Sequence, residues 1–317
     1  MRSRSTTIPV WPALPYAEWR ETCTTLHLWL QVVGKVRLAQ TPWVNHSWHA
    51  TLYVTASGLT TGPIPHGQRS FQIDFDLIEH VLRFRTSDDQ QQRLPLAPQP
   101  VATFASRVLE TLDRLGLPVH IRDVPSEMPD PIPFHEDHVH REYDREAAHR
   151  FWQALVQVDR VFRHFRTGFI GKVSPVHLFW GALDLAVTRF SGRRAPLHPG
   201  GVPGLPDEIT REAYSHEVSS AGFWPGGGGI DYPAFYSYAY PEPDGFRTAT
   251  IHPEQAFYEP ALGEFVLPYD VVRQADDPDA TLLQFLQSAY DAAAERGGWP
   301  RTELECPLGR PGVPRPI

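Results

Sequence analysis

The chain of 317 residues is 41% hydrophobic, enough to bury a large core as one big domain or as two coupled halves. Its formal charge of −8, without a basic stripe, argues against nucleic acid as a partner. No window approaches the roughly 20 apolar residues of a membrane helix, no apolar signal segment follows the N-terminus, and the only cysteines are Cys23 and Cys306. We therefore expect a cytoplasmic protein with reduced thiols and no membrane partner.

Two helices and a group of strands are predicted in the first half of the chain. Apolar residues recur at helical spacing over 16–38 and 101–115, and Gly34-Lys35 is a candidate end or kink of the first helix. Alternation of polar and apolar residues predicts strands over 48–55, 70–76, 80–86, 93–96 and 119–122.

A Pro-rich, acidic segment over 124–144 connects this half to the second. It contains a histidine cluster, for which this setting favours a solvated loop over a metal site. The cluster consists of His135, His138 and His140. The second half is predicted to form helices over 145–165 and 279–295 and strands over 177–190, 235–240 and 263–267.

Both halves contain the tripeptide Gly-Lys-Val, at 34–36 and at 171–173, between a helix and an aromatic strand that begins with histidine. This pattern suggests an internal duplication, with chance similarity as the alternative. The predicted fold is α+β, with two similar helix–antiparallel-sheet–helix halves related by a pseudo-twofold axis and packed as one globular unit. Its segments are an N-terminal half over 1–123, the connector over 124–144, a C-terminal half over 145–300 and a loose tail over 301–317. A cleft between the halves is the expected ligand site.

The segment 214–229, Tyr-Ser-His-Glu-Val-Ser-Ser-Ala-Gly-Phe-Trp-Pro-Gly-Gly-Gly-Gly, contains the first candidates for chemistry. A carboxylate beside an imidazole can hold the imidazole pKa near neutrality, so His216 and Glu217 are predicted to be a general acid–base pair. Because neighbours on a strand face opposite ways, the pair can cooperate only in a loop. Ordinary hydrogen-bonding side chains near a turn are the alternative.

Four consecutive glycines, 226–229, end this segment. We expect at least one of them to adopt a positive φ or to approach the cleft, and the run to lie near His216. Gly227 and Gly228 would then form a backbone cradle for the ligand, with Trp224 covering the site. A slack surface loop is the alternative.

Three further histidines, His46, His49 and His177, are predicted to line the opposite wall of the cleft as catalytic residues. Together with His216 or Glu217 they also offer a metal site, although a hydrogen-bonded structural histidine is the more common case.

Basic residues near the two Gly-Lys-Val tripeptides predict a site for negative charge, with ion pairs to Asp184 and other carboxylates as the alternative. These residues are Lys35, Arg37, Lys172 and Arg189. Tyr238, in the aromatic strand over 235–240, is predicted to be a pocket wall, with core packing as the alternative.

Several segments of the chain resemble the bacterial DUF5996 family. They are Trp-Pro-Ala-Leu-Pro at 11–15, Leu-His-Leu-Trp at 26–29, Val-Gly-Lys-Val-Arg-Leu at 33–38, Leu-Tyr-Val-Thr at 52–55 and the segment 214–229. The resemblance extends over nearly the whole chain and implies a bacterial, stand-alone globular protein. Because the family is a domain of unknown function, the resemblance implies no reaction and no catalytic residues.

These patterns predict an enzyme that acts on a small polar or anionic metabolite by His/Glu acid–base chemistry in the cleft between the halves. Two alternatives remain open: a non-catalytic small-molecule-binding protein and a His/Glu metal-dependent enzyme. The sequence indicates neither a cofactor nor the oligomeric state.

Overall fold

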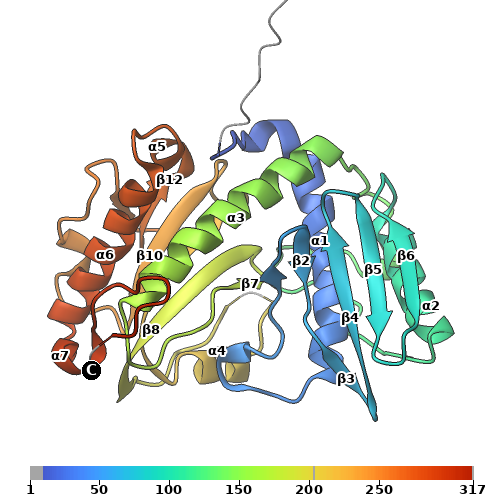
Figure 1. The fold of residues 1–317 in the computed structure, drawn as a ribbon, viewed down its shortest axis with the longest axis horizontal. Helices are drawn as coiled ribbons and strands as arrows, with labels where there is room; N and C mark the ends of the chain where they lie inside the picture. Colours follow the sequence, from blue (N-terminus) through green and yellow to red (C-terminus); the bar gives the residue numbers. More distant parts are fainter. Residues whose placement is uncertain (1–9, 203, 316–317) are drawn as a thin grey trace, which may run out of the picture.

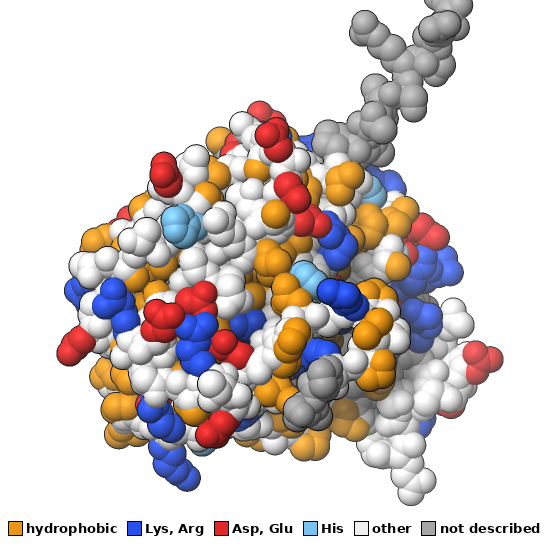
Figure 2. Space-filling view, turned by 60° about the vertical axis from the view of Figure 1, so that its left-hand side comes forward, with side chains coloured by type: hydrophobic (Ala, Val, Ile, Leu, Met, Phe, Trp, Pro, Cys, Tyr) orange, Lys and Arg blue, Asp and Glu red, His pale blue; other side chains and the backbone are white. Residues whose placement is uncertain are grey.

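Two antiparallel sheets of six strands each, accompanied by helices, make up the computed structural model, which describes residues 10–202 and 204–315 (Figure 1). The fold is therefore mixed α+β, and each sheet is preceded and followed by a helix, as predicted. Acidic and basic side chains are interspersed on the face shown in Figure 2, without a region of one sign. Within the described residues, no helix is both long enough and apolar enough to cross a membrane.

The first sheet has the strand order β1-β2-β4-β5-β6, with β3 paired to β4. Its strands are β1 (Tyr53–Val54), β2 (Gly58–Thr60), β3 (Ile64–His66), β4 (Arg69–Asp76), β5 (Val81–Thr86) and β6 (Gln91–Pro95). Helices α1 (Tyr16–Gln40) and α2 (Val101–Arg114) accompany this sheet. The ring of Trp29 on α1 stacks on that of Phe104 on α2 at 4.7 Å, and Phe104 stacks in turn on Phe75 of β4. These three aromatic side chains bury the sheet face against both helices.

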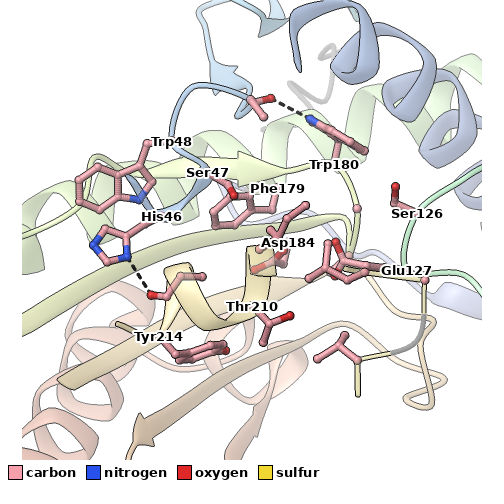
Figure 3. Close-up of a pocket in the computed structure, with 18 of the residues that line it drawn as sticks. His46, Ser47, Trp48, Ser126, Glu127, Phe179, Trp180, Asp184, Thr210 and Tyr214 are labelled. Atoms are coloured by element: carbon pink, nitrogen blue, oxygen red, sulfur yellow. Dashed lines mark hydrogen bonds between the residues drawn. The ribbon is translucent and has the colours of Figure 1, made fainter. Parts of the chain in front are cut away.

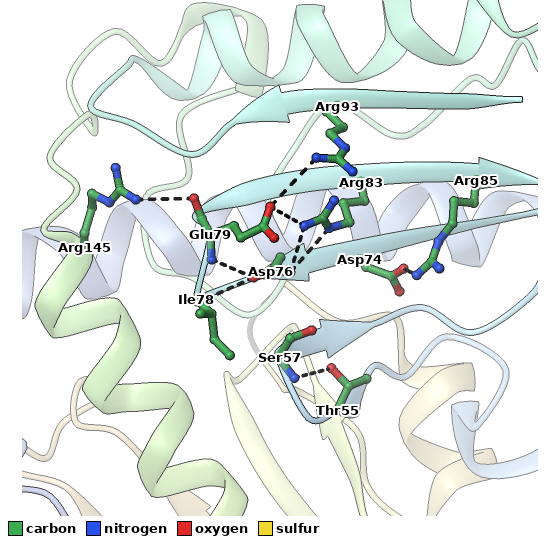
Figure 4. A network of polar contacts seen from close by, with 10 residues as sticks. All are labelled: Thr55, Ser57, Asp74, Asp76, Ile78, Glu79, Arg83, Arg85, Arg93 and Arg145. Atoms are coloured by element: carbon green, nitrogen blue, oxygen red, sulfur yellow. Dashed lines mark hydrogen bonds and ion pairs between the residues drawn. The ribbon is translucent and has the colours of Figure 1, made fainter. Parts of the chain in front are cut away.

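A polar network closes the hairpin between β4 and β5 (Figure 4). The carboxylate of Asp76 accepts hydrogen bonds from the backbone N–H groups of Ile78 and Glu79, and it also pairs with Arg83 at 3.2 Å. These contacts outweigh the burial of Asp76 and lower its pKa. The hairpin is thus held in register on the side of the sheet away from the helices.

The second sheet has the order β11-β12-β10-β9-β8-β7. Its strands are β7 (His177–Phe179), β8 (Asp184–Arg194), β9 (His216–Trp224), β10 (Ala234–Tyr240), β11 (Phe257–Glu259) and β12 (Glu264–Pro268). Helices α3 (Arg145–Thr167) and α6 (Pro278–Arg296) cover one face, and α3 runs diagonally across it in Figure 1. Shorter helices are α4 (Asp207–Ala213), α5 (Tyr269–Arg273) and α7 (Arg301–Leu304), and short 3-10 turns are η1 (Asn45–Ser47), η2 (Phe134–Glu136) and η3 (Phe246–Thr248).

The two sheets meet where their first strands lie side by side. Leu52 and Leu178 exchange backbone hydrogen bonds of 2.8 and 2.9 Å, and Trp19 of α1 contacts Phe151 of α3 with ring centroids 5.2 Å apart. Most of the buried hydrophobic side chains therefore belong to one continuous core. The pseudo-twofold relation between the halves stays a prediction. The two Gly-Lys-Val tripeptides occupy different local structures, since residues 34–36 lie inside α1 and residues 171–173 follow the end of α3.

Periodicity predicted α1, α2, α3 and α6 to within a few residues, but the prediction of a break in α1 is wrong. The helix continues through Gly34, where the absence of a side chain leaves room for the indole of Trp180: an added Cβ would lie 2.3 Å from Trp180 Cδ1. The segment predicted as a loose tail begins with α7, and Tyr290 of α6 donates a hydrogen bond of 2.9 Å to Glu305.

Three predicted strands differ in the structure. Residues 48–55 contribute only the short β1, because His46 and Ser47 in the preceding turn take positive φ values of 59° and 56° and redirect the chain. Residues 177–190 form the hairpin of β7 and β8 in place of one strand, and Leu183 with φ 56° lies in its turn. The turn residues 180–183, Trp-Gly-Ala-Leu, include no polar side chain, so the alternation pattern does not reveal the turn. Residues 119–122 pair with no strand of the described chain, since strand propensity does not itself provide a partner.

Candidate functional site

A cavity of about 620 Å³ lies on the face of the second sheet opposite α3 and α6 (Figure 3). Its walls come from both halves of the chain: the C-terminal part of α1, the segments 43–50 and 122–127, the β7–β8 turn, and α4 with the residues before it. Strands β8, β9, β10 and β12 form its floor. The cavity is thus the place where residues far apart in the sequence meet.

Strand alternation decides which side chains of the floor enter the cavity. Asp184, Trp224 and Tyr236 face it, whereas their neighbours Leu185 and Phe223 are fully buried in the hydrophobic core.

A missing side chain lets Tyr236 reach Asp184 across a strand. Gly222 of β9 lies opposite Tyr236 of β10, and a Cβ at Gly222 would lie 2.3 Å from the Tyr236 hydroxyl. The tyrosine ring therefore lies over the glycine, and its hydroxyl donates a hydrogen bond of 2.5 Å to Asp184 Oδ2 on β8.

Three carboxyl groups in this cavity titrate close to neutrality. Burial raises the pKa of Asp184 to about 6, although the Tyr236 hydrogen bond lowers it. Burial and the charge of Asp184 raise the pKa of Glu264 to about 8 and that of Glu127 to about 7. The buried Oε2 atom of Glu264 has no hydrogen-bond partner in the part of the chain described. Glu127 is exposed as a whole residue, but its carboxyl group reaches inward against Gly181.

Aromatic rings cover much of the remaining cavity surface. Trp224 stacks on Tyr236 with ring centroids 4.2 Å apart, and the hydroxyl of Tyr214 donates a hydrogen bond of 2.9 Å to that of Tyr238. Trp180 lines the cavity from the β7–β8 turn, and its indole N–H donates a hydrogen bond of 2.7 Å to the carbonyl of Ala50. The predicted wall residues Trp224 and Tyr238 therefore both lie in the cavity.

Lys35 is the predicted ligand-binding cation that lies in the cavity. Its side chain is buried, its ammonium donates a hydrogen bond of 2.9 Å to Ser126 Oγ, and it lies 5.4 Å from the centre of the Trp180 ring. Burial, followed by the positive charge of Arg122, lowers its pKa to about 8.

His46 also lines the cavity, near Trp48 (Figure 3). Its Nδ1–H donates a hydrogen bond of 2.8 Å to the carbonyl of Ala213, so its Nε2 is free to accept one of 2.6 Å from the ammonium of Lys172. Burial lowers the pKa of His46, and the two hydrogen bonds specify a neutral ring with the proton on Nδ1. Lys172 itself is exposed and reaches the cavity lining through this histidine and through the rings of Trp48 and Phe190, whose centres lie 5.5 and 4.6 Å from its ammonium.

His216 and Glu217 are the first two residues of β9, and the structure does not bring them together. The carboxylate of Glu217 pairs with Arg193 at 2.7 Å and accepts a hydrogen bond from Ser191. The ring of His216 contacts its neighbour Ser215, and the centres of the His216 and His46 rings lie 6.5 Å apart. His46 lines the cavity, but His216 does not. The two residues could cooperate only in a loop, but they lie in a strand, where neighbouring side chains face opposite ways.

The glycine run is also placed differently from the prediction. All four glycines have positive φ values, between 63° and 110°, which confirms the expected backbone. They follow the C-terminal end of β9, a nine-residue strand that begins with His216. The strand is about 26 Å long, so the glycines do not lie near His216 and that prediction is wrong. Gly227 and Gly228 do not line the cavity, and Gly226 packs against the ring of Tyr16.

The remaining predicted residues have structural partners outside the cavity lining. His177 is fully buried and donates a hydrogen bond of 2.7 Å to the carbonyl of Pro175, and burial lowers its pKa to about 4. His49 contacts the backbone of Val44, and Arg37 donates a hydrogen bond of 2.6 Å to the carbonyl of His49. Arg189 lies on the opposite face of the sheet, 3.6 Å from the centre of the Phe165 ring. Among the described residues, no three His, Cys, Asp or Glu side chains are grouped so that they could hold a metal ion.

Sequence reasoning missed the carboxyl groups Glu127, Asp184 and Glu264. Asp184 could have been identified from the sequence, because it is the one charged residue among the apolar residues 178–187. The rarity of lysine was a further signal, and it points to Lys35: of the 29 lysines and arginines in the chain, only Lys35 and Lys172 are lysines.

Comparison with known proteins places the chain in a family. The model of DUF5996, described as a family of unknown function, matches residues 11–306, and the chain belongs to this family. No curated protein and no solved structure matches the chain.

Proposed function

We propose that this member of the DUF5996 family binds a small organic molecule in the cavity between its halves and acts on it by acid–base chemistry of Asp184 and Glu264. The proposal keeps the predicted cleft and the predicted type of chemistry. It moves the chemistry from His216 and Glu217 to carboxyl groups that line the cavity.

The observation that carries this proposal is the Asp184–Tyr236 hydrogen bond of 2.5 Å beside the unpartnered carboxyl oxygen of Glu264. The tyrosine stabilises the ionised form of Asp184, whose pKa is about 6, so this group is mostly a base at neutral pH. Glu264, with a pKa of about 8, is mostly a proton donor at the same pH. Two carboxyl groups with separated pKa values in one cavity are a typical acid–base arrangement.

The cavity walls indicate which molecules fit. The stacked rings of Trp224 and Tyr236 and the indole of Trp180 offer flat apolar surfaces for a ring or a short hydrocarbon chain. Lys35 supplies one positive charge, consistent with a polar or anionic group at one end of the ligand. A volume of about 620 Å³ is in the usual range for small-molecule sites.

A thermal-shift screen with a library of small metabolites tests the binding part of this proposal. Ala182 lines the cavity and its side chain is exposed, so Ala182→Trp should obstruct the cavity without disturbing the core. Ala97→Trp, at an exposed position between β6 and α2, is the matched control. A ligand at about 100 times its Kd should stabilise the wild type and Ala97→Trp by about 2.7 kcal/mol, but not Ala182→Trp.

Equal stabilisation of all three proteins would place binding outside the cavity and contradict the proposal. A ligand that binds in the cavity and is recovered unchanged would favour the alternative of a non-catalytic binding protein.

A further inference from the structure

We propose that Lys35 is an amine nucleophile that condenses with the carbonyl group of an aldehyde or ketone bound in the cavity. This inference rests on the proposed function, since it requires a small molecule in the same cavity, and it names the chemical class of that molecule.

The choice of lysine at this position is the first observation. Of the 29 lysines and arginines in the chain, all but Lys35 and Lys172 are arginine. Apart from Lys172, arginine supplies the positive charge at every other position, so a requirement for positive charge alone would not explain a lysine here. Lysine differs from arginine in that it can lose its proton near neutral pH and then attack an electrophile.

The surroundings of Lys35 favour the neutral amine. As a whole residue it is only 4% exposed, and within the described residues no carboxylate forms an ion pair with its ammonium. Its hydrogen-bond partner is the neutral hydroxyl of Ser126 at 2.9 Å. Burial and the positive charge of Arg122 lower its pKa, and together they outweigh the charge of Glu127, which raises it. With a pKa of about 8, roughly a tenth of the Lys35 side chains are unprotonated at pH 7. Burial together with a nearby cation is a known way to activate a lysine nucleophile.

Glu127 is placed to move the protons of this reaction. It follows Ser126 in the chain, lines the same cavity (Figure 3), and interacts electrostatically with Lys35. The neutral Nζ forms a bond to the carbonyl carbon while the C=O π electrons move to oxygen, and a proton passes from the positively charged nitrogen to that oxygen to give a carbinolamine. Glu127 then protonates the hydroxyl, water leaves as the nitrogen lone pair forms the C=N bond, and the Glu127 carboxylate takes back the remaining N–H proton. Amine and carbonyl are converted to imine and water, without any change in oxidation state.

The ring surfaces around Lys35 define the rest of the ligand. Trp180 lies beneath the ammonium, and Phe179 lines the cavity from the same hairpin. A carbonyl compound with a ring or an apolar chain would place its apolar part on these surfaces and its carbonyl carbon at Nζ.

Reductive trapping tests the proposal, with benzaldehyde as the probe and cyanoborohydride to convert the imine into a stable secondary amine. Peptide mass spectrometry distinguishes label on Lys35 from label on Lys172 or on the N-terminal amine, and Lys172, which is exposed and outside the cavity lining, is the internal comparison. We expect Lys35 to be labelled at least tenfold faster than Lys172 at pH 7, with a rate that rises up to about pH 8 and then levels off. Ala182→Trp should slow the labelling of Lys35 but not that of Lys172, and Glu127→Gln should slow it at Lys35 severalfold.

Labelling of Lys172 as fast as that of Lys35, or labelling of Lys35 that keeps rising with pH like an ordinary lysine, would overturn the proposal. Lys35→Arg retains the charge but cannot form the imine, so it separates this inference from the broader one. If cavity ligands stabilise wild type and Lys35→Arg equally while Lys35 resists labelling, the proposed function stands and Lys35 acts only as a cation. If Lys35 is labelled but Asp184 and Glu264 variants convert cavity ligands at the wild-type rate, the imine proposal stands and the proposed acid–base roles of these carboxyl groups are wrong.

Discussion

Replacing Glu264 by glutamine should make the protein more stable at alkaline pH, because the wild-type carboxylate ionises there without a partner. The pKa of Glu264 is raised from an ordinary 4.5 to about 8, so the folded state holds this proton more tightly than the unfolded state. The folded state therefore binds more protons between these two pH values, and stability falls as pH rises through them. A pKa difference of about 3.5, at about 1.36 kcal/mol for each tenfold change in proton affinity, sets an upper bound of roughly 5 kcal/mol.

The expected effect is smaller than this bound. Glu264 is only partly buried and faces the cavity, so water screens part of the charge, and we expect a difference on the order of 2 kcal/mol. Glutamine has nearly the shape of the protonated acid, so the two proteins should be equally stable near pH 4.5. The variant should gain its advantage between about pH 5 and pH 8.

Urea unfolding at a series of pH values measures this difference in the free energy of unfolding. The exposed carboxylate Glu254 is the matched control, and Glu254→Gln should show a difference from wild type that does not change with pH. In an Asp184→Asn background the effect of Glu264→Gln should shrink, since the charge of Asp184 is the second cause of the raised pKa. A constant difference between Glu264→Gln and wild type from pH 5 to pH 9 would refute the assignment of a partly buried Glu264 that holds its proton at neutral pH.

Two further predictions concern residues outside the cavity. Gly226→Ala should destabilise the protein by about 2 kcal/mol or more, because φ is 110° and the new Cβ would lie 2.5 Å from Tyr16, whereas Gly228→Ala, at φ 63° with open space, should cost about 1 kcal/mol in urea unfolding. Equal costs would show that contact with Tyr16 is unimportant. Glu217→Gln weakens the partly exposed pair with Arg193 and should lower the free energy of unfolding by about 1 kcal/mol. Ligand binding measured by thermal shift should not change, and loss of binding would show that Glu217 belongs to the site.

The sequence predicted the helices and the overall fold class because these follow from local periodicity. The buried stripe of α3, for example, includes Phe151, Leu155, Val158 and Phe162, all of them fully or almost fully buried. The hairpin of β7 and β8 could not be predicted in this way. Its turn contains Trp180, which packs against Gly34 of α1 and donates a hydrogen bond to Ala50, and both contacts join residues more than one hundred positions apart in sequence.

The candidate site was predicted in part, for a similar reason. Four predicted site residues do line the cavity: Lys35, His46, Trp224 and Tyr238. The pairing of Asp184 with Tyr236 depends on the register of three adjacent strands and on the absence of a side chain at Gly222. No sequence pattern encodes such a register directly.

The most direct test of the central claim compares wild type with Asp184→Asn in a metabolite extract, followed by mass spectrometry over time. Asparagine keeps an oxygen that can accept the Tyr236 hydrogen bond but cannot act as a base, so the variant should fold and bind normally. At least one small molecule should be consumed by the wild type and persist with Asp184→Asn. A folded Asp184→Asn protein that consumes the same compound at the wild-type rate would contradict the assignment of Asp184 as the base.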